Sequence, residues 1–426
     1  MTTGRWPLGR DSTLLVAGQA VRAAGYGFTA VLLGALLAAR GYSHLRVGVV
    51  LTALIAGTAL SSLVVGRLAD RAGRRRSYAV FFAGVAAAGA VVAAGAPFWV
   101  LLVVALTGTL STDVVDNGPA TTLEQTMLAA DDAGTSRVYG VYNAIGAGAG
   151  ALGALAAALP GVRPGGGSGS AVHGWLFVVL VPVGVAGVLL ASRLSAAVEV
   201  PPGPPTLADA PAASARLGPS RGTVRRLAAL FAVDAGGGGL VTTGFLSYYF
   251  ASRYHVSLAA LGWLFFAVSV VQAISVALAP RLARRFGLIP TMVGTHLPSN
   301  LLLAAVAFAP TFPVAVVLLL ARTTLSQMDV PTRQALVMSV VTPAERTPAA
   351  AVTNAARYTV RPIGPLIAGV VQNIAIGAPL VVAGTVKGGY DLALWVWAHR
   401  HLPDQGARPA ESETTRLGGE SGAIAN

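Results

Sequence analysis

Long apolar stretches alternate with short polar segments along almost the whole chain. Each stretch is close to the length of about 20 residues that an apolar helix needs to cross a bilayer. Glycine, proline and clustered charges mark the ends of the stretches. The pattern predicts twelve membrane-spanning helices over residues 13–39, 45–66, 77–96, 98–120, 137–160, 174–194, 227–250, 257–279, 288–309, 313–341, 347–372 and 376–398.

A longer polar segment separates the sixth predicted span from the seventh. It contains four prolines between positions 201 and 205, followed by several arginines. This composition is typical of an extended or flexible linker, and the polar, Gly-rich end of the chain is typical of disorder. We therefore expect a six-helix bundle in 1–194, a cytoplasmic linker in 195–226, a second six-helix bundle in 227–400 and a disordered cytoplasmic tail in 401–426.

The composition agrees with a membrane protein and excludes several other classes. Apolar residues make up 54% of the 426 residues, charged residues only 11%, and the mean hydropathy is +0.67. A soluble domain is about 25% charged, so a soluble enzyme, a disordered chain and a nucleic-acid-binding domain are excluded. The chain has no cysteine, and its six histidines lack the spacing of a metal site. We expect no cofactor and no metal.

The basic residues predict how the chain is oriented. With both termini in the cytoplasm, twenty of the 30 basic residues fall in cytoplasmic segments and four in outer loops. Cytoplasmic loops of membrane proteins are enriched in Arg and Lys. The net charge of +13 is thus assigned to the membrane topology rather than to nucleic-acid binding. We expect a multi-pass protein of the plasma membrane, monomeric, with the lipid bilayer as its surroundings.

The two halves share short sequence matches at similar offsets. GRLADRAG at 66–73 follows the second predicted span, and PRLARRFG at 280–287 follows the eighth. VYNA at 141–144 corresponds in the same way to VTNA at 352–355. Matches in corresponding spans predict two six-helix repeats related by an axis along the membrane normal.

The first of these loops resembles a known family. Residues 66–75 fit the pattern Gly, any, Leu, small, Asp, basic, any, Gly, basic, basic, which resembles the signature loop between spans two and three of the major facilitator superfamily. The resemblance implies an all-α membrane protein with twelve transmembrane helices in two pseudo-symmetric six-helix bundles. It also implies a conformational latch in this loop, formed by Gly66, Asp70, Arg71, Gly73 and Arg74, in which Asp70 pairs with Arg71 or Arg74.

The fifth predicted span is rich in glycine. It carries Gly146, Gly148, Gly150 and Gly153. This resembles the fifth span of antiporters in the same superfamily, although the proline of that pattern is missing. The alternative is close helix packing through small residues.

Ionisable residues inside predicted spans are candidates for a substrate or proton pathway, because they are costly in lipid. Those of spans one, four, seven and ten would line the central cavity by the family resemblance. The candidates are Arg22, Asp113, Asp116, Asp234, Arg322, Asp329, Arg333, Arg357 and Arg361.

Spacing along a helix groups some of these residues. Asp329 and Arg333 lie one turn apart and are expected to pair, as are Lys387 and Asp391 in the last span. Arg357 and Arg361 share a helix face, which implies an acidic partner or an anionic ligand. Asp113 and Asp116 are expected on one face of span four, where two carboxylates cannot easily both ionise and one is expected to hold a proton.

Two neighbouring features predict local breaks in helices. Four glycines follow Asp234 at 236–239 and weaken the helix there, and Pro362 follows Arg361 and favours a kink. Transporters build mid-membrane sites at such breaks.

These features favour a secondary active transporter that moves a small solute by alternating access. Proton-coupled efflux of amphiphilic or toxic compounds is the preferred hypothesis, and proton-coupled uptake or exchange of an anionic metabolite is the alternative. A membrane-embedded enzyme is disfavoured because the histidines do not cluster and no large extramembrane domain is present. A channel is disfavoured by the repeated halves and the latch loop. No phosphate-binding loop of an ATPase occurs.

Overall fold

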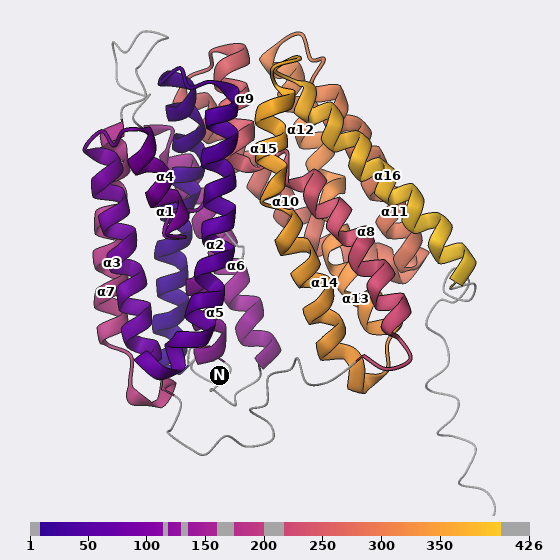
Figure 1. The fold of residues 1–426 in the computed structure, drawn as a ribbon, viewed down its shortest axis with the longest axis horizontal. Coiled ribbons are helices and arrows are strands. Elements are labelled where there is room, and N and C mark those ends of the chain that lie inside the picture. The colour runs from indigo at the N-terminus through magenta and orange to yellow at the C-terminus, as the bar shows by residue number, and fades with distance from the viewer. Residues whose placement is uncertain (1–8, 114–117, 129–134, 160–173, 200–216, 402–426) are drawn as a thin grey trace, which may run out of the picture.

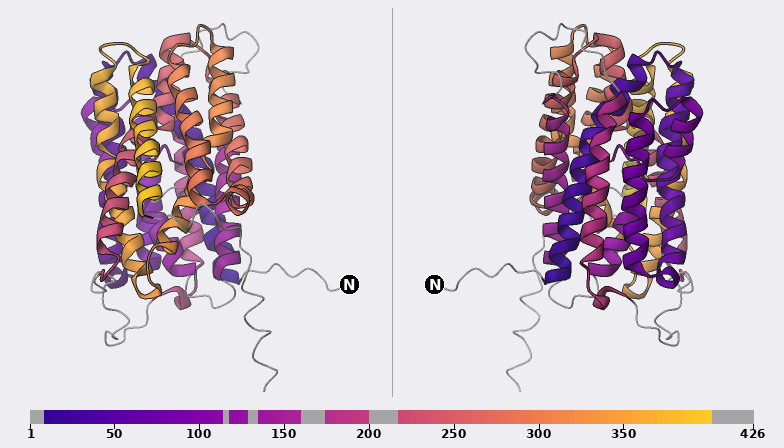
Figure 2. Two further views of the ribbon diagram at one scale, coloured as in Figure 1. Left: turned by 90° about the vertical axis from the view of Figure 1, so that its right-hand side faces the viewer. Right: turned by 90° about the vertical axis from the view of Figure 1, so that its left-hand side faces the viewer.

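The computed structural model of the chain describes residues 9–113, 118–128, 135–159, 174–199 and 217–401. The regular elements in these ranges are helices, and no strand occurs among them. Figure 1 shows the helices in two side-by-side groups, one from each half of the sequence. The views in Figure 2 show that most helices run along one common direction.

The first group contains the helices of the N-terminal half. They are α1 (Arg10–Ala39), α2 (His44–Ala72), α3 (Arg74–Ala93), α4 (Phe98–Leu106), α5 (Pro119–Leu128), α6 (Thr135–Ala156), the 3-10 helix η2 (Gly174–Val179), α7 (Leu180–Ser192) and the short 3-10 helix η3 (Ala196–Val198).

The second group contains the helices of the C-terminal half. They are α8 (Arg221–Gly239), α9 (Thr243–Tyr254), α10 (Leu258–Phe286), α11 (Leu288–Val306), α12 (Phe312–Ser326), α13 (Asp329–Ser339), the 3-10 helix η5 (Pro343–Glu345), α14 (Arg346–Val360), α15 (Ile363–Val371) and α16 (Ala378–His401).

Each predicted span coincides with one helix or with a consecutive pair of helices. Seven of the described helical segments are long and apolar enough to cross a membrane by length and composition. An α-helix satisfies its backbone hydrogen bonds within one segment and without water, so the long apolar stretches fold as helices. The protein is an all-α, multi-pass membrane protein. Its linker residues 200–216 and tail residues 402–426 lie outside the described ranges.

The fourth span is interrupted, contrary to the expectation of a continuous helix over 98–120. α4 ends at Leu106, and α5 begins only at Pro119. Gly108 has φ +71° and contacts α2, where a side chain would clash with the carbonyl oxygen of Gly57. A residue with positive φ cannot continue a right-handed helix, and proline starts a new one. Asp113 therefore lies in a non-helical segment.

Three spans of the second half are also divided into two helices. The break between α8 and α9 follows the four glycines, as expected. Pro362 separates α14 from α15, also as expected. The tenth span divides between α12 and α13 at Gln327 and Met328. This third break was not expected from the sequence, although Pro331 in the first turn of α13 has no amide to bond to the carbonyl oxygen of Gln327.

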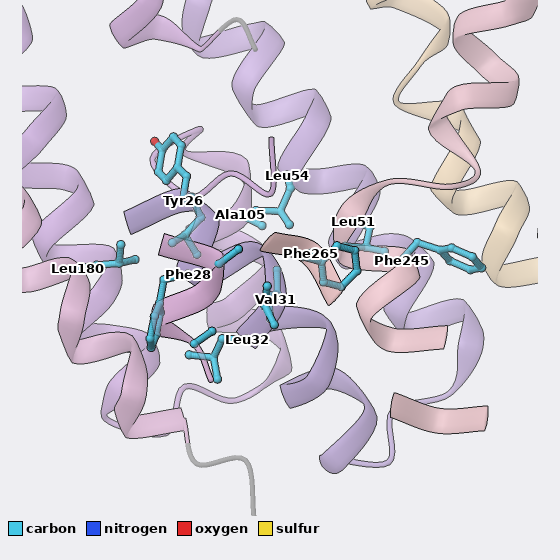
Figure 3. Packing of buried hydrophobic residues seen from close by; sticks show 14 of the residues in the cluster. Tyr26, Phe28, Val31, Leu32, Leu51, Leu54, Ala105, Leu180, Phe245 and Phe265 are labelled. Carbon is cyan, nitrogen blue, oxygen red and sulfur yellow. The ribbon is translucent and has the colours of Figure 1, made fainter. Parts of the chain in front are cut away.

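The two halves pack closely at the end of the molecule opposite the start of α1. Figure 3 shows side chains of α1 and α2 together with Phe245 of α9 and Phe265 of α10 in one apolar cluster. Ser247 donates a hydrogen bond to the carbonyl oxygen of Val31 at 2.5 Å. We call this region the closed end; such close approach requires small residues.

Glycines permit this approach at three crossings of the closed end. A side chain at Gly34 would overlap the backbone of α9, and one at Gly48 would lie 2.5 Å from the carbonyl oxygen of Pro365. Gly262 of α10 packs in the same way on α6.

The same helix crossing occurs once in each half. Gly153 of α6 lies against the backbone of Ala24 in α1. The corresponding Gly364 of α15 lies against Gly239 at the end of α8. The equivalence supports the predicted repeat, and it assigns close packing to at least this glycine of the fifth span.

Candidate functional site

A buried polar cluster lies inside the N-terminal half, and we call it the Arg22 cluster. Arg22 of α1 and Glu124 of α5 form an ion pair of 2.8 Å, and their side chains are 1% and 0% exposed. Tyr78 of α3 donates a hydrogen bond of 2.7 Å to Glu124, and Tyr142 of α6 donates a shorter one. The carboxylate thus accepts from three elements at once, and this satisfies its buried charge.

The Arg22 cluster fixes four helices relative to one another. Arg22 also contacts Thr121 at 3.1 Å and the side-chain oxygen of Gln19. Its charge is therefore directed into the first half rather than toward the other half. Glu124 was not among the expected site residues, because it follows the predicted end of span four at residue 120.

A second cluster lies inside the C-terminal half, and we call it the Asp234 cluster. Its members come from α8, α11, α13 and α16, namely Asp234, His296, Asp329, Arg333, Lys387 and Asp391. All six residues are buried. They place three carboxylates beside three basic side chains in the low-dielectric interior, where isolated charges are strongly disfavoured.

Asp234 is the centre of this cluster. Lys387 donates a short hydrogen bond to it, the guanidinium of Arg333 lies at 3.6 Å, and Nε2 of His296 lies at 3.9 Å. Asp329 pairs with Arg333 at 2.8 Å, as its spacing predicted.

Lys387 and Asp391 do not pair with each other, contrary to the expectation from their spacing. Asp391 instead contacts Nδ1 of His296 at 2.8 Å and accepts a hydrogen bond of 2.8 Å from Asn300. His296 thus lies between two carboxylates. No sequence pattern predicted its role, because a lone histidine in an apolar helix has no recognisable pattern.

Two further predicted arginines lie near the Asp234 cluster. Arg322 of α12 is partly buried, and its Nε is buried without a hydrogen-bond partner among the described residues. Arg357 of α14 interacts electrostatically with Asp234.

A cavity of about 790 Å³ lies between the two halves. It is lined by the later part of α2, the segment 111–113, α5, α14 and the residues that follow α14. These parts lie toward the end of the molecule at which α1 begins. The cavity size is within the usual range for small-molecule sites, about 300–1,000 Å³.

One ion pair on the wall of this cavity connects the two halves. Nη2 of Arg361 donates a hydrogen bond of 2.8 Å to Asp113, and the side chains are 23% and 24% exposed. The acidic partner expected for the arginines of span eleven is thus Asp113. Asp116 lies outside the described residues.

The predicted latch loop joins α2 to α3. Gly73 has φ +91° and separates the two helices, and Arg71 is exposed. Gly66 has open space around its Cα. The side chain of Asp70 is outside the described part of the structure.

Glu199 at the end of the first half binds this loop. Its carboxylate accepts hydrogen bonds from the backbone amides of Arg74 at 2.7 Å and Arg75 at 3.1 Å. An acidic group at a helix N-terminus is favourable because it satisfies free amides and interacts with the helix dipole. No local pattern predicts this contact, because 125 residues separate Glu199 from Arg74.

Comparisons with known proteins agree with this architecture. Residues 15–365 match the model of the Major Facilitator Superfamily. An uncharacterized membrane protein of Saccharomyces cerevisiae is 26% identical over 398 residues, which cover 85% of this chain and 88% of the relative.

Solved transporter structures share the fold. A nucleoside transporter has a TM-score of 0.69 at 15% identity, with 92% of this chain and 99% of that one covered. The xylose transporter of E. coli, in an inward-open conformation, has a TM-score of 0.66 at 16% identity, with 90% and 95% covered. Because the family model covers most of the sequence and the fold agrees, the chain belongs to the Major Facilitator Superfamily of membrane transporters.

Proposed function

We propose that the protein is a secondary active transporter that carries a small amphiphilic solute by alternating access. One observation carries this proposal: the halves pack together at one end and leave a cavity between them toward the other. Movement of the halves about this cavity would expose it to each side in turn. With both termini in the cytoplasm of a plasma-membrane protein, the cavity faces inward.

The cavity lining favours an amphiphilic solute over a simple anion. α2 contributes mostly apolar side chains, such as Leu54, Ile55 and Leu63, while α5 and α14 contribute hydroxyl and amide groups. The alternative of an anionic metabolite depended on the arginines of spans one, ten and eleven. Arg22 and Arg333 are neutralised by buried carboxylates, and Arg361 is paired with Asp113.

Proton coupling is proposed for the Asp234 cluster. Histidine gains or loses its proton near neutral pH more readily than other side chains, and His296 contacts one carboxylate directly and lies near a second. The charged and titratable groups around it come from α8 (Asp234), α13 (Asp329, Arg333), α12 (Arg322), α14 (Arg357) and α16 (Lys387, Tyr390, Asp391). A proton taken up here would change how Asp234 holds three helices together.

Efflux is the proposed direction, based on the resemblance of the fifth span to that of antiporters. The latch is proposed for Asp70 with Arg71 or Arg74, and the contacts of Glu199 with the same loop support a role for this segment in holding one conformation.

Transport by purified protein in proteoliposomes tests these proposals. An imposed pH gradient should drive accumulation of an amphiphilic dye, and a proton ionophore should abolish it. Matched anionic metabolites serve as the alternative substrates. Flux of an anion with no flux of the dye would replace the first proposal with the second, and flux insensitive to the ionophore would exclude proton coupling.

A further inference from the structure

The charges on the cavity wall define a solute class more narrowly, and this inference rests on the proposed transport function. Among the described residues that line the cavity, Asp113 and Arg361 carry the only formal charges. Each is about one quarter exposed, so a solute in the cavity can reach both groups.

The two charges come from different halves of the protein. Asp113 belongs to the segment between α4 and α5, and Arg361 follows α14. A solute that replaces their direct contact of 2.8 Å has to satisfy both groups. Losing one partner of a partly buried ion pair is costly for the other.

Single charges on a solute fit this pair poorly. An anion would bind Arg361 but would be repelled by the carboxylate of Asp113. A cation would bind Asp113 but would be repelled by the guanidinium of Arg361. Like charges placed together in an interface are a strong basis for rejecting a ligand. A solute with one positive and one negative group can pair with Asp113 and Arg361 together and leave the charge of the site balanced.

The remaining lining supplies room for an apolar part. Leu54, Ile55, Leu60 and Leu63 of α2 line the same cavity as the ion pair. Leu60 and Leu63 are 57% and 60% exposed, so their burial by a solute would be favourable. Thr122 and Gln125 of α5 and Asn354 of α14 add hydrogen-bonding groups.

We propose that the cavity binds zwitterionic amphiphiles, whose cationic group pairs with Asp113, whose anionic group pairs with Arg361, and whose apolar chain lies along α2. Insertion of such a headgroup exchanges one ion pair between the halves for two ion pairs with the solute. Binding therefore removes a direct ion pair between the halves and couples recognition of the solute to their movement.

Equilibrium binding to the full-length protein in lipid nanodiscs tests the proposal without any ion gradient. The probes are four hexyl compounds with a sulfobetaine, trimethylammonium, sulfonate or hydroxyl headgroup, and empty nanodiscs give the background. The sulfobetaine should bind at least tenfold more tightly than the other three, because only its quaternary ammonium and sulfonate together compensate the charges of both Asp113 and Arg361.

Single substitutions should change the preference in opposite directions. Asp113→Asn should weaken sulfobetaine binding about tenfold or more and favour the sulfonate, whereas Arg361→Gln should favour the trimethylammonium compound. Arg253→Gln is the matched control, because it makes the same chemical change at an exposed arginine outside the cavity. The double substitution Asp113→Arg/Arg361→Asp retains a pair and should retain sulfobetaine binding if the single variants fold poorly.

Equal binding of the charged and zwitterionic probes by the unaltered protein would overturn the proposal. The same holds if neither single variant changes the preference. Sulfobetaine binding without proton-driven flux would contradict the proposed coupling but not this inference. Proton-driven flux of another solute class, without sulfobetaine preference, would contradict this inference alone.

Discussion

Arg22 of α1 and Asp234 of α8 lie on the first spans of the two halves and carry opposite charges. Arg22 pairs with Glu124 on the fourth span of its half at 2.8 Å, and Asp234 lies 3.6 Å from Arg333 on the fourth span of the other half. The repeat thus preserves a charged connection between its first and fourth spans but reverses its sign. Each connection holds its own half together, while Asp113 and Arg361 connect the halves to each other.

The Arg22 cluster predicts a large effect of removing Glu124. Glu124→Leu should destabilise the protein by about 3–5 kcal/mol, because Arg22 is left buried and uncompensated. Thermal unfolding of the purified protein in detergent should show a clearly lower midpoint. The double substitution Arg22→Met/Glu124→Leu is the control and should recover much of the loss. A single variant as stable as the unaltered protein would show that the pair does not hold this half together.

The close packing of Gly34 predicts that a larger side chain opens the closed end. The side chain in Gly34→Leu would overlap α9. More of the protein molecules should therefore adopt a conformation in which the halves are separated at the closed end. The chain contains no cysteine, and a single Leu51→Cys substitution therefore reports on this buried surface without a background. Its rate of labelling by a maleimide should rise several-fold in the Gly34→Leu protein.

Gly148 provides the matched control for this experiment. A side chain there has open space around it, so Gly148→Leu should leave the labelling rate of Leu51→Cys unchanged. Equal rates in the two leucine variants would contradict the role given to the glycine crossing.

The Asp234 cluster predicts a variant that exchanges solute but is not driven by protons. Asp234→Asn with Lys387→Met removes both members of the closest pair, so no opposite charge is left alone in that contact. In proteoliposomes the double variant should lose the response to an imposed pH gradient by tenfold or more. Solute exchange at equal pH on both sides should persist.

Retention of gradient-driven flux by this double variant would remove Asp234 from the coupling mechanism. His296→Gln should likewise lose gradient-driven flux and keep solute exchange at equal pH, because it removes the imidazole ring between the two carboxylates.

Glu345 predicts a pH-dependent contact outside the membrane. Hydrogen bonds from the hydroxyl of Ser220, the hydroxyl of Thr342 and the backbone amides of Gly218 and Ser220 lower the pKa of its carboxyl below the usual 4.5. A lowered pKa in the folded state means that the contact stabilises fully above pH 4.5 and is lost as the pH falls through the lowered value.

Hydrogen exchange of the Gly218 and Ser220 amides measures this contact. Protection, corrected for the intrinsic rate, should be high at neutral pH and should decrease at pH values below 4.5. Glu345→Gln should reduce protection at neutral pH and remove most of the pH dependence. Unchanged protection in this variant would show that the carboxylate does not hold the start of α8.

Local features of the sequence determined the helices and some of their breaks. The apolar stretches predicted the spans because lipid offers no partner for free backbone groups. The glycines at 236–239 and Pro362 predicted two interruptions, since both act on the backbone of their own turn. Asp329 and Arg333 were predicted to pair because four residues bring them to one helix face.

Only the tertiary structure decided which buried charges meet. Glu124 lies 102 residues from Arg22, Lys387 lies 153 from Asp234, and Arg361 lies 248 from Asp113. Helical periodicity fixes which residues share a face but not how that face is turned toward other helices. That rotation is set by packing of the whole bundle, including the glycine crossings. The partners of His296 and the position of the cavity therefore could not be predicted from the sequence.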